Sequence, residues 1–243
     1  MGDGEERVLS DAIEEIRDGP GVFVAGSDTG VGKTVVTAGL TGWLREDGLG
    51  ARAIKPAQTG APEDDDAAVI SAAAGGDSDA STCCRRLGPA LAPRTAAERE
   101  GVALAYDEIL ADCRDEMESS GFPIVEGIGG LRVPLAGEAE VLDLAVDLGL
   151  PAIVVARSGL GTLNHTALTV DALRSRGVSV PFVVLNEYEG ATIAERTNPD
   201  ELRRMLDVPV AKLAPFDATN ASEIVPAVRD ALTPPFDEDD FVD

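Results

Sequence analysis

The chain has 243 residues, 44% of them hydrophobic, which is enough for a sizeable core and too much for a disordered chain. Its 44 acidic residues against 20 basic ones give a net charge of -24; such a surface repels nucleic acid and anionic membrane, which we exclude as general partners. No stretch approaches the ~20 uncharged apolar residues that span a bilayer, and the acidic N-terminus lacks the apolar core of a signal peptide, so we expect a cytoplasmic protein.

Lysine is scarce in this chain. Lys33, Lys55 and Lys212 are the only lysines among the 20 basic residues. Together with the spread of acidic residues, this composition suggests a halophilic protein, in which hydrated carboxylates keep the chain in solution at high salt. A lysine that falls within a motif is therefore expected to have a specific task.

The cysteines do not form a recognisable framework. Cys83, Cys84 and Cys113 are odd in number and show no CxxC spacing, and two adjacent cysteines do not easily bridge each other. The pattern argues against a disulfide framework or a zinc site, and it favours buried or incidental thiols.

The predicted elements alternate between strand and helix. The chain opens with residues 7–17, which predict a short amphipathic helix or a mobile extension. The further segments, in chain order, are strand 21–26, helix 33–47, strand 51–56, helix 64–74, an irregular region 75–100, helix 101–118, strand 122–127, a glycine-rich turn 127–130, helix 140–148, strand 151–156, helix 163–176, strand 180–186, helix 199–206 and strand 208–213.

This alternation predicts the fold class. The strands are continuous apolar runs, as expected for a mainly parallel sheet covered on both faces. We therefore predict an α/β fold with a single doubly wound sheet, of the P-loop NTPase type. The expected division is an N-terminal extension (1–20), one domain (21–233) and an acidic tail (234–243).

The segment GSDTGVGKT, residues 26–34, predicts a phosphate-binding loop. It lies between a predicted strand and a predicted helix, which is the context that a P-loop requires. Its backbone N–H groups and the following helix start favour an anion, Lys33 can reach the β- and γ-phosphates, and the Thr34 hydroxyl can bind Mg²⁺. The nucleotide-binding residues expected here are Asp28, Thr29, Gly30, Val31, Gly32, Lys33 and Thr34.

The loop departs from the usual spacing in one position. The pattern G-x-x-x-x-G-K-[ST] places a glycine at residue 27, but Ser27 stands there and the glycine is Gly26. A glycine-rich turn that binds nothing is the alternative. The loop also lacks the early lysine of partitioning-type switch ATPases, which disfavours that class.

Further chemistry is expected at the carboxyl ends of other strands, because these ends line the ligand crevice of a doubly wound sheet. Lys55 ends the second strand and would join Lys33 in stabilising a transferred phosphoryl group, unless it is a surface lysine. Glu126 ends the third strand and suits Mg²⁺, as does one of Asp64, Asp65 and Asp66, although an acidic run is commonly a solvated face.

Two more positions have open interpretations. Asn186 ends the strand VVLN and either offers its amide to a purine edge or simply forms a turn. Thr162 and Asn164 stand at a predicted helix start, where free N–H groups can bind an anion. His165 is the only histidine, and no nucleophile motif accompanies it.

Several motifs together resemble the dethiobiotin synthetase family. They are GSDTGVGKT, AIKPAQTG, LGPALAPRTAAEREG, VEGIGGLRVPL, PAIVVARSGLGTLNHTALTVDALRSRG and VVLN, and the resemblance covers roughly residues 21–215. It implies an enzyme that uses ATP, Mg²⁺ and CO₂ to close a ureido ring on 7,8-diaminononanoate. The implied intermediates are a carbamate and a carbamic-phosphoric anhydride, and the implied products are dethiobiotin, ADP and phosphate.

The resemblance also implies residue roles. Lys33 and Lys55 would be catalytic; Thr34, Asp66 and Glu126 would bind Mg²⁺; and Asn186 would bind adenine. Thr29 and Thr59 would lie near phosphate and substrate. Gly161, Thr162 and Asn164 would bind the substrate carboxylate across the interface of a homodimer.

The sequence departs from the family pattern in two respects, and two alternative functions remain open. Arg94 stands where the family pattern leads us to expect a histidine, and no downstream aromatic contact to the substrate carboxylate can be placed. A partitioning-type switch ATPase is one alternative function. A cobyrinate-type amide ligase is the other, although the sequence shows no Cys-His-Glu glutaminase constellation.

Overall fold

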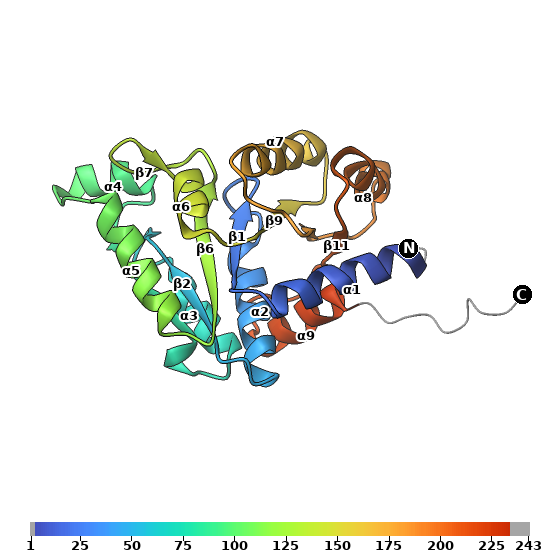
Figure 1. Cartoon of the computed structure of the whole chain (residues 1–243), viewed down its shortest axis with the longest axis horizontal. Coiled ribbons are helices and arrows are strands. Elements are labelled where there is room, and N and C mark those ends of the chain that lie inside the picture. Colours follow the sequence, from blue (N-terminus) through green and yellow to red (C-terminus); the bar gives the residue numbers. More distant parts are fainter. Residues whose placement is uncertain (1–2, 234–243) are drawn as a thin grey trace, which may run out of the picture.

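The computed structural model describes residues 3–233 and shows one seven-stranded sheet between two layers of helices (Figure 1). The sheet has the order β11-β10-β9-β1-β6-β2-β4, and all neighbouring strands are parallel. The predicted doubly wound α/β class is confirmed. Its strands are β1 (Val22–Gly26), β2 (Ala51–Lys55), β4 (Ser81–Cys83), β6 (Phe122–Gly130), β9 (Ala152–Arg157), β10 (Val183–Asn186) and β11 (Val210–Lys212).

Two short strand pairs lie beside the main sheet. β3 (Gln58–Thr59) pairs in parallel with β5 (Arg86–Leu87), and β7 (Pro134–Ala136) pairs antiparallel with β8 (Ala139–Glu140). The helices are α1 (Asp3–Arg17), α2 (Lys33–Glu46), α3 (Asp66–Ala73), α4 (Pro93–Glu100), α5 (Tyr106–Glu118), α6 (Val141–Leu148), α7 (Thr162–Ser175), α8 (Ile193–Leu206) and α9 (Ala221–Leu232), with a 3-10 turn at Ser78–Ala80.

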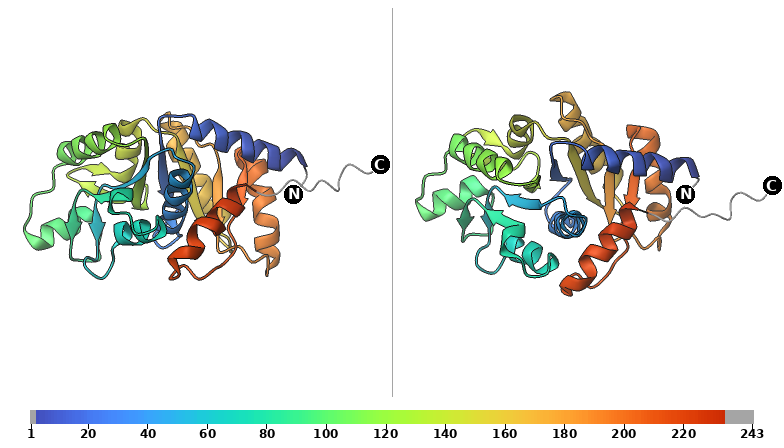
Figure 2. Two further views of the ribbon diagram at one scale, coloured as in Figure 1. Left: turned by 90° about the horizontal axis from the view of Figure 1, so that it is seen from below. Right: turned by 60° about the horizontal axis from the view of Figure 1, so that its bottom comes forward.

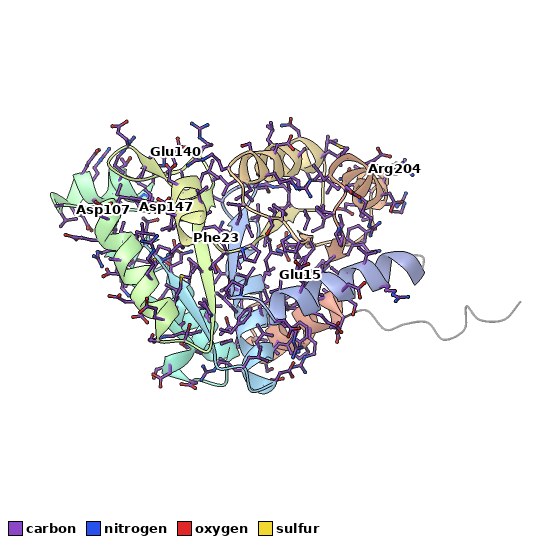
Figure 3. All side chains as sticks on the ribbon, in the orientation of Figure 1. Glu15, Phe23, Asp107, Glu140, Asp147 and Arg204 are labelled. Carbon is purple, nitrogen blue, oxygen red and sulfur yellow. The ribbon has the colours of Figure 1, made fainter. Side chains whose placement is uncertain are left out.

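Each face of the sheet has its own apolar core. Helices α5, α6, α7 and α8 pack on one face, and α1, α2 and α9 pack on the other. Figure 2 shows α2 between α3 and α9, both of which it contacts. Phe23 of β1 lies fully buried in the interior, whereas Asp107 and Arg204 project from the outer surface (Figure 3).

The N-terminal segment forms a helix that joins one of these cores. Leu9, Ile13 and Ile16 recur at helical spacing along α1 and are buried against the same cluster as Trp43. Arg17 stacks over the Trp43 ring at 5.3 Å from its centroid. The proposed boundary at residue 20 stays a prediction, and the acidic tail 234–243 lies outside the described residues. Within residues 3–233, no helix combines the length and apolarity needed to cross a membrane.

Several predicted elements are wrong in extent. The region 75–100 is not irregular throughout: it holds β4, β5 and α4, which pattern reading missed because β4 is a short half-buried edge strand and α4 is mostly polar. The turn predicted at 127–130 continues β6, because Gly130 still pairs with Gly26 of β1 beyond an irregularity in register.

Helix boundaries differ for related reasons. The helix predicted from 101 begins only at Tyr106, because Gly101 ends α4 in the left-handed region at φ 67°. The helix predicted from 199 begins at Ile193, where Thr192 and Glu195 form a capping box, and Pro199 lies inside it. Helix α9 was not predicted at all.

Candidate active site

The loop after β1 folds back around its own lysine. Lys33 is buried, and its Nζ donates a hydrogen bond to the carbonyl of Asp28 at 3.2 Å. A Cβ at position 26 would lie 2.8 Å from Lys33 Nζ and 2.9 Å from the Asp28 carbonyl oxygen. A side chain at position 26 would therefore crowd both the Lys33 side chain and the backbone carbonyl of Asp28, and Gly26 leaves the space that these two groups occupy.

A second lysine reaches the same place from β2. Lys55 Nζ lies 2.7 Å from Oε1 of Glu126 and 2.6 Å from Oδ2 of Asp66. The same Glu126 oxygen accepts a hydrogen bond from the Thr34 hydroxyl at 2.9 Å. The Thr34 side chain also forms a hydrogen bond with the Asp66 side chain. Four side chains from β2, β6 and the starts of α2 and α3 thus meet at the carboxyl end of the sheet.

Burial and opposite charges shift the pKa values of these groups. Burial, followed by the neighbouring Lys55 ammonium, lowers the pKa of Lys33 to about 8. Burial also acts to lower the pKa of Lys55, but the carboxylates of Glu126 and Asp66 outweigh it and raise that pKa. For Asp66, burial acts upward, and the contacts with Lys55 and Thr34 outweigh it and lower the pKa.

These groups line an open cleft of about 400 Å³. Its walls come from the phosphate loop, β2, β3, the start of α3 and β6, and the lining residues are Thr29, Gly30, Gly32, Lys33, Thr34, Val35, Lys55, Ala57, Gln58, Thr59, Asp64, Asp66, Glu126, Ile128 and Gly129. The two lysines, both expected carboxylates and Thr59 thus face one volume. Their roles in binding and catalysis stay predictions.

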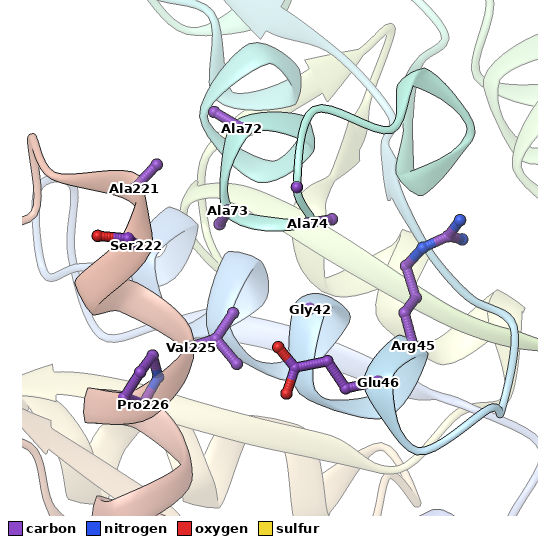
Figure 4. A pocket seen from close by; sticks show the side chains of 11 residues that line it. Gly42, Arg45, Glu46, Ala72, Ala73, Ala74, Ala221, Ser222, Val225 and Pro226 are labelled. Carbon is purple, nitrogen blue, oxygen red and sulfur yellow. The ribbon is translucent and has the colours of Figure 1, made fainter.

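A larger hollow of about 720 Å³ lies elsewhere, between α2, α3 and α9 (Figure 4). Small side chains line most of it, and its two charged residues, Arg45 and Glu46, are paired with Asp77 and Arg229. It offers neither a phosphate loop nor convergent unpaired polar groups. The smaller cleft is therefore the candidate functional site.

The cleft suits a divalent cation. Oε2 of Glu126 is buried and has no hydrogen-bond partner among the described residues, so one carboxylate oxygen lacks a ligand. Asp66 and the Thr34 hydroxyl supply further oxygens beside it. Residues 3–233 contain no group of three His, Cys, Asp or Glu residues that would hold a metal by themselves. Mg²⁺ typically takes one or two carboxylates plus water and phosphate oxygens, which is the set available here.

Asn186 packs against the phosphate loop at Gly32. A Cβ at Gly32 would lie 2.1 Å from Asn186 Nδ2, and Gly32 has a φ of 96°. The side chain of Asn186 is nearly buried at the end of β10. The amide of a distant strand therefore packs directly on the loop, where an adenine edge is expected.

Five further predicted residues do not line the cleft. Asp28 and the buried Val31 belong to the phosphate loop, whereas Gly161, Thr162 and Asn164 form the N-terminal end of α7, where Thr162 is buried and Asn164 is exposed. The preceding segment is held by Asn198, whose Nδ2 donates to the carbonyls of Ser158 and Gly159 at 2.8 and 3.2 Å. Leu160, just before this helix start, is 92% exposed.

Two residues at the site were not singled out from the sequence. Gln58 accepts a hydrogen bond from the backbone N–H of Asp66 at 3.3 Å, which helps to place α3. Arg157 ends β9 and lies 3.0 Å from Asp28, whose other oxygen accepts from the Thr29 N–H at 2.7 Å. Gln58 and Arg157 both follow shortly after a predicted strand, and this position is the feature of the sequence that could have identified them.

Comparison with known proteins places the chain in a family. A family described as an AAA domain matches residues 20–219. The chain is 53% identical over 209 residues to the ATP-dependent dethiobiotin synthetase of Haloferax mediterranei, covering 86% of this chain and 90% of that protein. It is 44% identical to the enzyme of the same name from Anaeromyxobacter sp. strain Fw109-5, covering 77% of this chain and 90% of that protein.

Solved structures with a similar fold come from more distant proteins. The cell division ATPase MinD of Pyrococcus furiosus has a TM-score of 0.55 at 17% identity, covering 88% of this chain and 96% of its own. A ParA family ATPase of Chlorobium tepidum has a TM-score of 0.55 at 14% identity, covering 88% and 92%. At such identities the likeness concerns the fold alone. The sequence relatives decide the family, and the chain belongs to the ATP-dependent dethiobiotin synthetases.

Proposed function

We propose that this protein is an ATP-dependent dethiobiotin synthetase, which closes a ureido ring on 7,8-diaminononanoate with CO₂ and ATP. The observation that carries the proposal is the meeting of Lys33 and Lys55 in one cleft beside two carboxylates. Paired ammonium groups suit the transfer of a γ-phosphoryl group, because charge develops on both donor and acceptor oxygens. A magnesium ion held by Thr34, Asp66 and Glu126 would supply further neutralisation of phosphate charge.

The proposed reaction proceeds through a carbamate and a carbamic-phosphoric anhydride. One substrate amine adds to CO₂ and gives a carbamate, and a carbamate oxygen attacks the γ-phosphorus as the bond to ADP breaks. The second amine then attacks the carbonyl carbon, and phosphate leaves as the ring closes. Lys33 neutralises the triphosphate, and Lys55 stabilises the oxygens of the carbamate and the transferred group. Both lysine side chains are buried in the wall of the open cleft, which would hold their ammonium groups close to the reacting atoms.

The remaining site residues complete this proposal. The backbone of the phosphate loop binds the phosphates, from Asp28 to Thr34, and Asn186 reads the adenine edge. Thr59 lies toward the substrate amines. In a homodimer, Gly161, Thr162 and Asn164 of one subunit bind the substrate carboxylate in the site of the other, which accords with their position outside the cleft of their own chain.

The setting of the enzyme is also part of the proposal. The net charge of -24 and the three lysines support the halophilic character, and the cytoplasm is the location that we propose for it. The described residues beyond 20 form the catalytic domain, with the N-terminal helix as an extension packed on it.

A coupled assay of ADP release tests the function. With MgATP, bicarbonate and 7,8-diaminononanoate present, we expect ADP release to require the diamine and dethiobiotin to form in equal amount. ATP turnover that ignores the diamine and rises with a protein partner would point to a switch ATPase instead. A requirement for glutamine or ammonia would point to an amide ligase of the cobyrinate type.

A further inference from the structure

Two thiols, those of Cys84 and Cys113, lie close together outside the set of residues that line the cleft. Cys84 directly follows β4, and Cys113 lies on α5. Cys113 is fully buried, and the partly buried Cys84 packs against the same apolar cluster. Each thiol is the largest single influence on the pKa of the other, which places the two side chains next to each other within this cluster. Residues far apart in the sequence thus bring two nucleophilic sulfur atoms together.

Neighbouring contacts hold these two segments in place. Arg85 donates from Nη1 to the carbonyl of Cys84 at 2.9 Å and forms an ion pair with Asp112, the residue before Cys113. A second oxygen partner, Glu108, lies 3.6 Å from the same guanidinium group. These contacts hold the end of β4 against α5 next to the two thiols, so the two sulfur atoms stay close to each other.

The three cysteines differ in their environments. The contact with Cys113 lowers the pKa of the Cys84 thiol, while the same contact and burial raise the pKa of Cys113. Cys83 points elsewhere, because its thiol donates to the carbonyl of Arg85 at 3.1 Å, and burial raises its pKa. Cys84 is only half-buried whereas Cys113 is fully buried, so a small molecule reaches Cys84 first and Cys113 reacts second from the interior.

We propose that Cys84 and Cys113 are a modification site, where a small-molecule disulfide converts the two thiols into a reversible intramolecular disulfide. The Cys84 thiolate attacks one sulfur of the small disulfide, forms a mixed disulfide and releases one small thiolate. Cys113 then loses its proton and attacks Cys84 Sγ, which releases the second small thiol. The small disulfide is reduced by two electrons, and the two protein thiols are oxidised by two.

The position of this bond couples it to the cleft. The backbone N–H of Cys84 donates to the carbonyl of Lys55 at 2.9 Å, and Cys83 is the register partner of Lys55 in the sheet. A disulfide to α5 would therefore fasten the backbone one hydrogen bond away from the second lysine. Neither sulfur lines the cleft itself.

Oxidised glutathione added to the folded full-length protein tests the proposal. We expect intact-mass analysis to show loss of two hydrogen atoms with no glutathione retained, and thiol titration to fall from three to one. A reductant should restore all three thiols. In denaturant the selectivity should vanish, because Cys83 and Cys84 then react alike.

Single variants identify the partners. Cys83→Ser should still form the bond, whereas Cys84→Ser should not, and Cys113→Ser should stop at the glutathione adduct on Cys84. Circular dichroism establishes that each variant is folded. A wild-type protein that keeps three thiols, that retains glutathione, or that still forms the bond after Cys84→Ser would overturn the assignment.

Discussion

Lys55, the last residue of β2, and Glu126, in the middle of the adjacent strand β6, form a buried ion pair with 2.7 Å between Nζ and Oε1. Glu126 is completely buried and Lys55 nearly so. Removing one partner of such a pair leaves an uncompensated charge in the interior. The pair therefore links the stability of the fold to the groups that we propose for catalysis.

Lys55→Ala is expected to abolish dethiobiotin formation while nucleotide affinity stays within a few-fold, because Lys55 acts on the transferred group. The same change should destabilise the protein by ~3–5 kcal/mol, since it leaves the charge of Glu126 unpaired. Denaturant unfolding and an ADP-binding titration measure the two effects separately.

Glu126→Gln in the Lys55→Ala background serves as the control for this prediction. It removes the stranded charge, so much of the lost stability should return while turnover stays absent. Turnover in Lys55→Ala close to that of the parent protein would refute the catalytic role.

Gly26→Ala should weaken ATP binding by about tenfold or more, because the new methyl group would displace the Lys33 ammonium from the loop. Ser27→Ala is the matched control at the adjacent position, since it adds no atom and should leave affinity nearly unchanged. Calorimetric titration with ATP measures both. Equal affinities for the two variants would show that Lys33 does not need this space.

Nucleotide affinity should fall as pH rises, because the pKa of Lys33 is lowered to about 8. The free protein loses this proton above that pH, whereas bound phosphates favour the charged form. Binding should therefore take up a proton and be about tenfold weaker at pH 9 than at pH 7. ADP titrations in EDTA check this without a metal ion, and Lys33→Arg should give a flat profile.

Asn186→Ala should weaken ATP binding without affecting inorganic triphosphate, because the amide packs on Gly32 at the proposed adenine site rather than at the phosphates. A loss of about 1–3 kcal/mol is expected for one amide pairing with a base edge. Competition titrations with both ligands provide the comparison. An equal loss for triphosphate would mean that Asn186 only supports the loop.

Leu168→Asp should convert a dimer into monomers. Leu160 is 92% and Leu168 62% exposed, and both flank the helix start that is proposed to reach the partner site. Val8→Asp, on the distant helix α1 at 53% exposure, should leave the mass unchanged. Sedimentation analysis reads the mass directly, and a wild-type monomer at assay concentrations would rule out the shared site.

The fold class and the clustering of the candidate site residues follow from the order of the residues along the chain. Apolar runs separated by helical segments predict a covered parallel sheet, and residues at the ends of parallel strands share one edge of it. That rule predicts that Lys33, Lys55 and Glu126 lie close together, because it depends only on local pattern and chain direction.

Which side chains pair with one another depends on how the sheet and its helices pack. That Asp66 contacts Lys55, while Asp64 lies against Gly60 and Asp65 pairs with Arg86, depends on where α3 begins relative to β2. The packing of Asn186 on Gly32 and the meeting of Cys84 with Cys113 depend likewise on strand register and helix docking. Local sequence patterns carry no information on such distances, because contacts between remote side chains are set by the packing of the whole sheet and its helices.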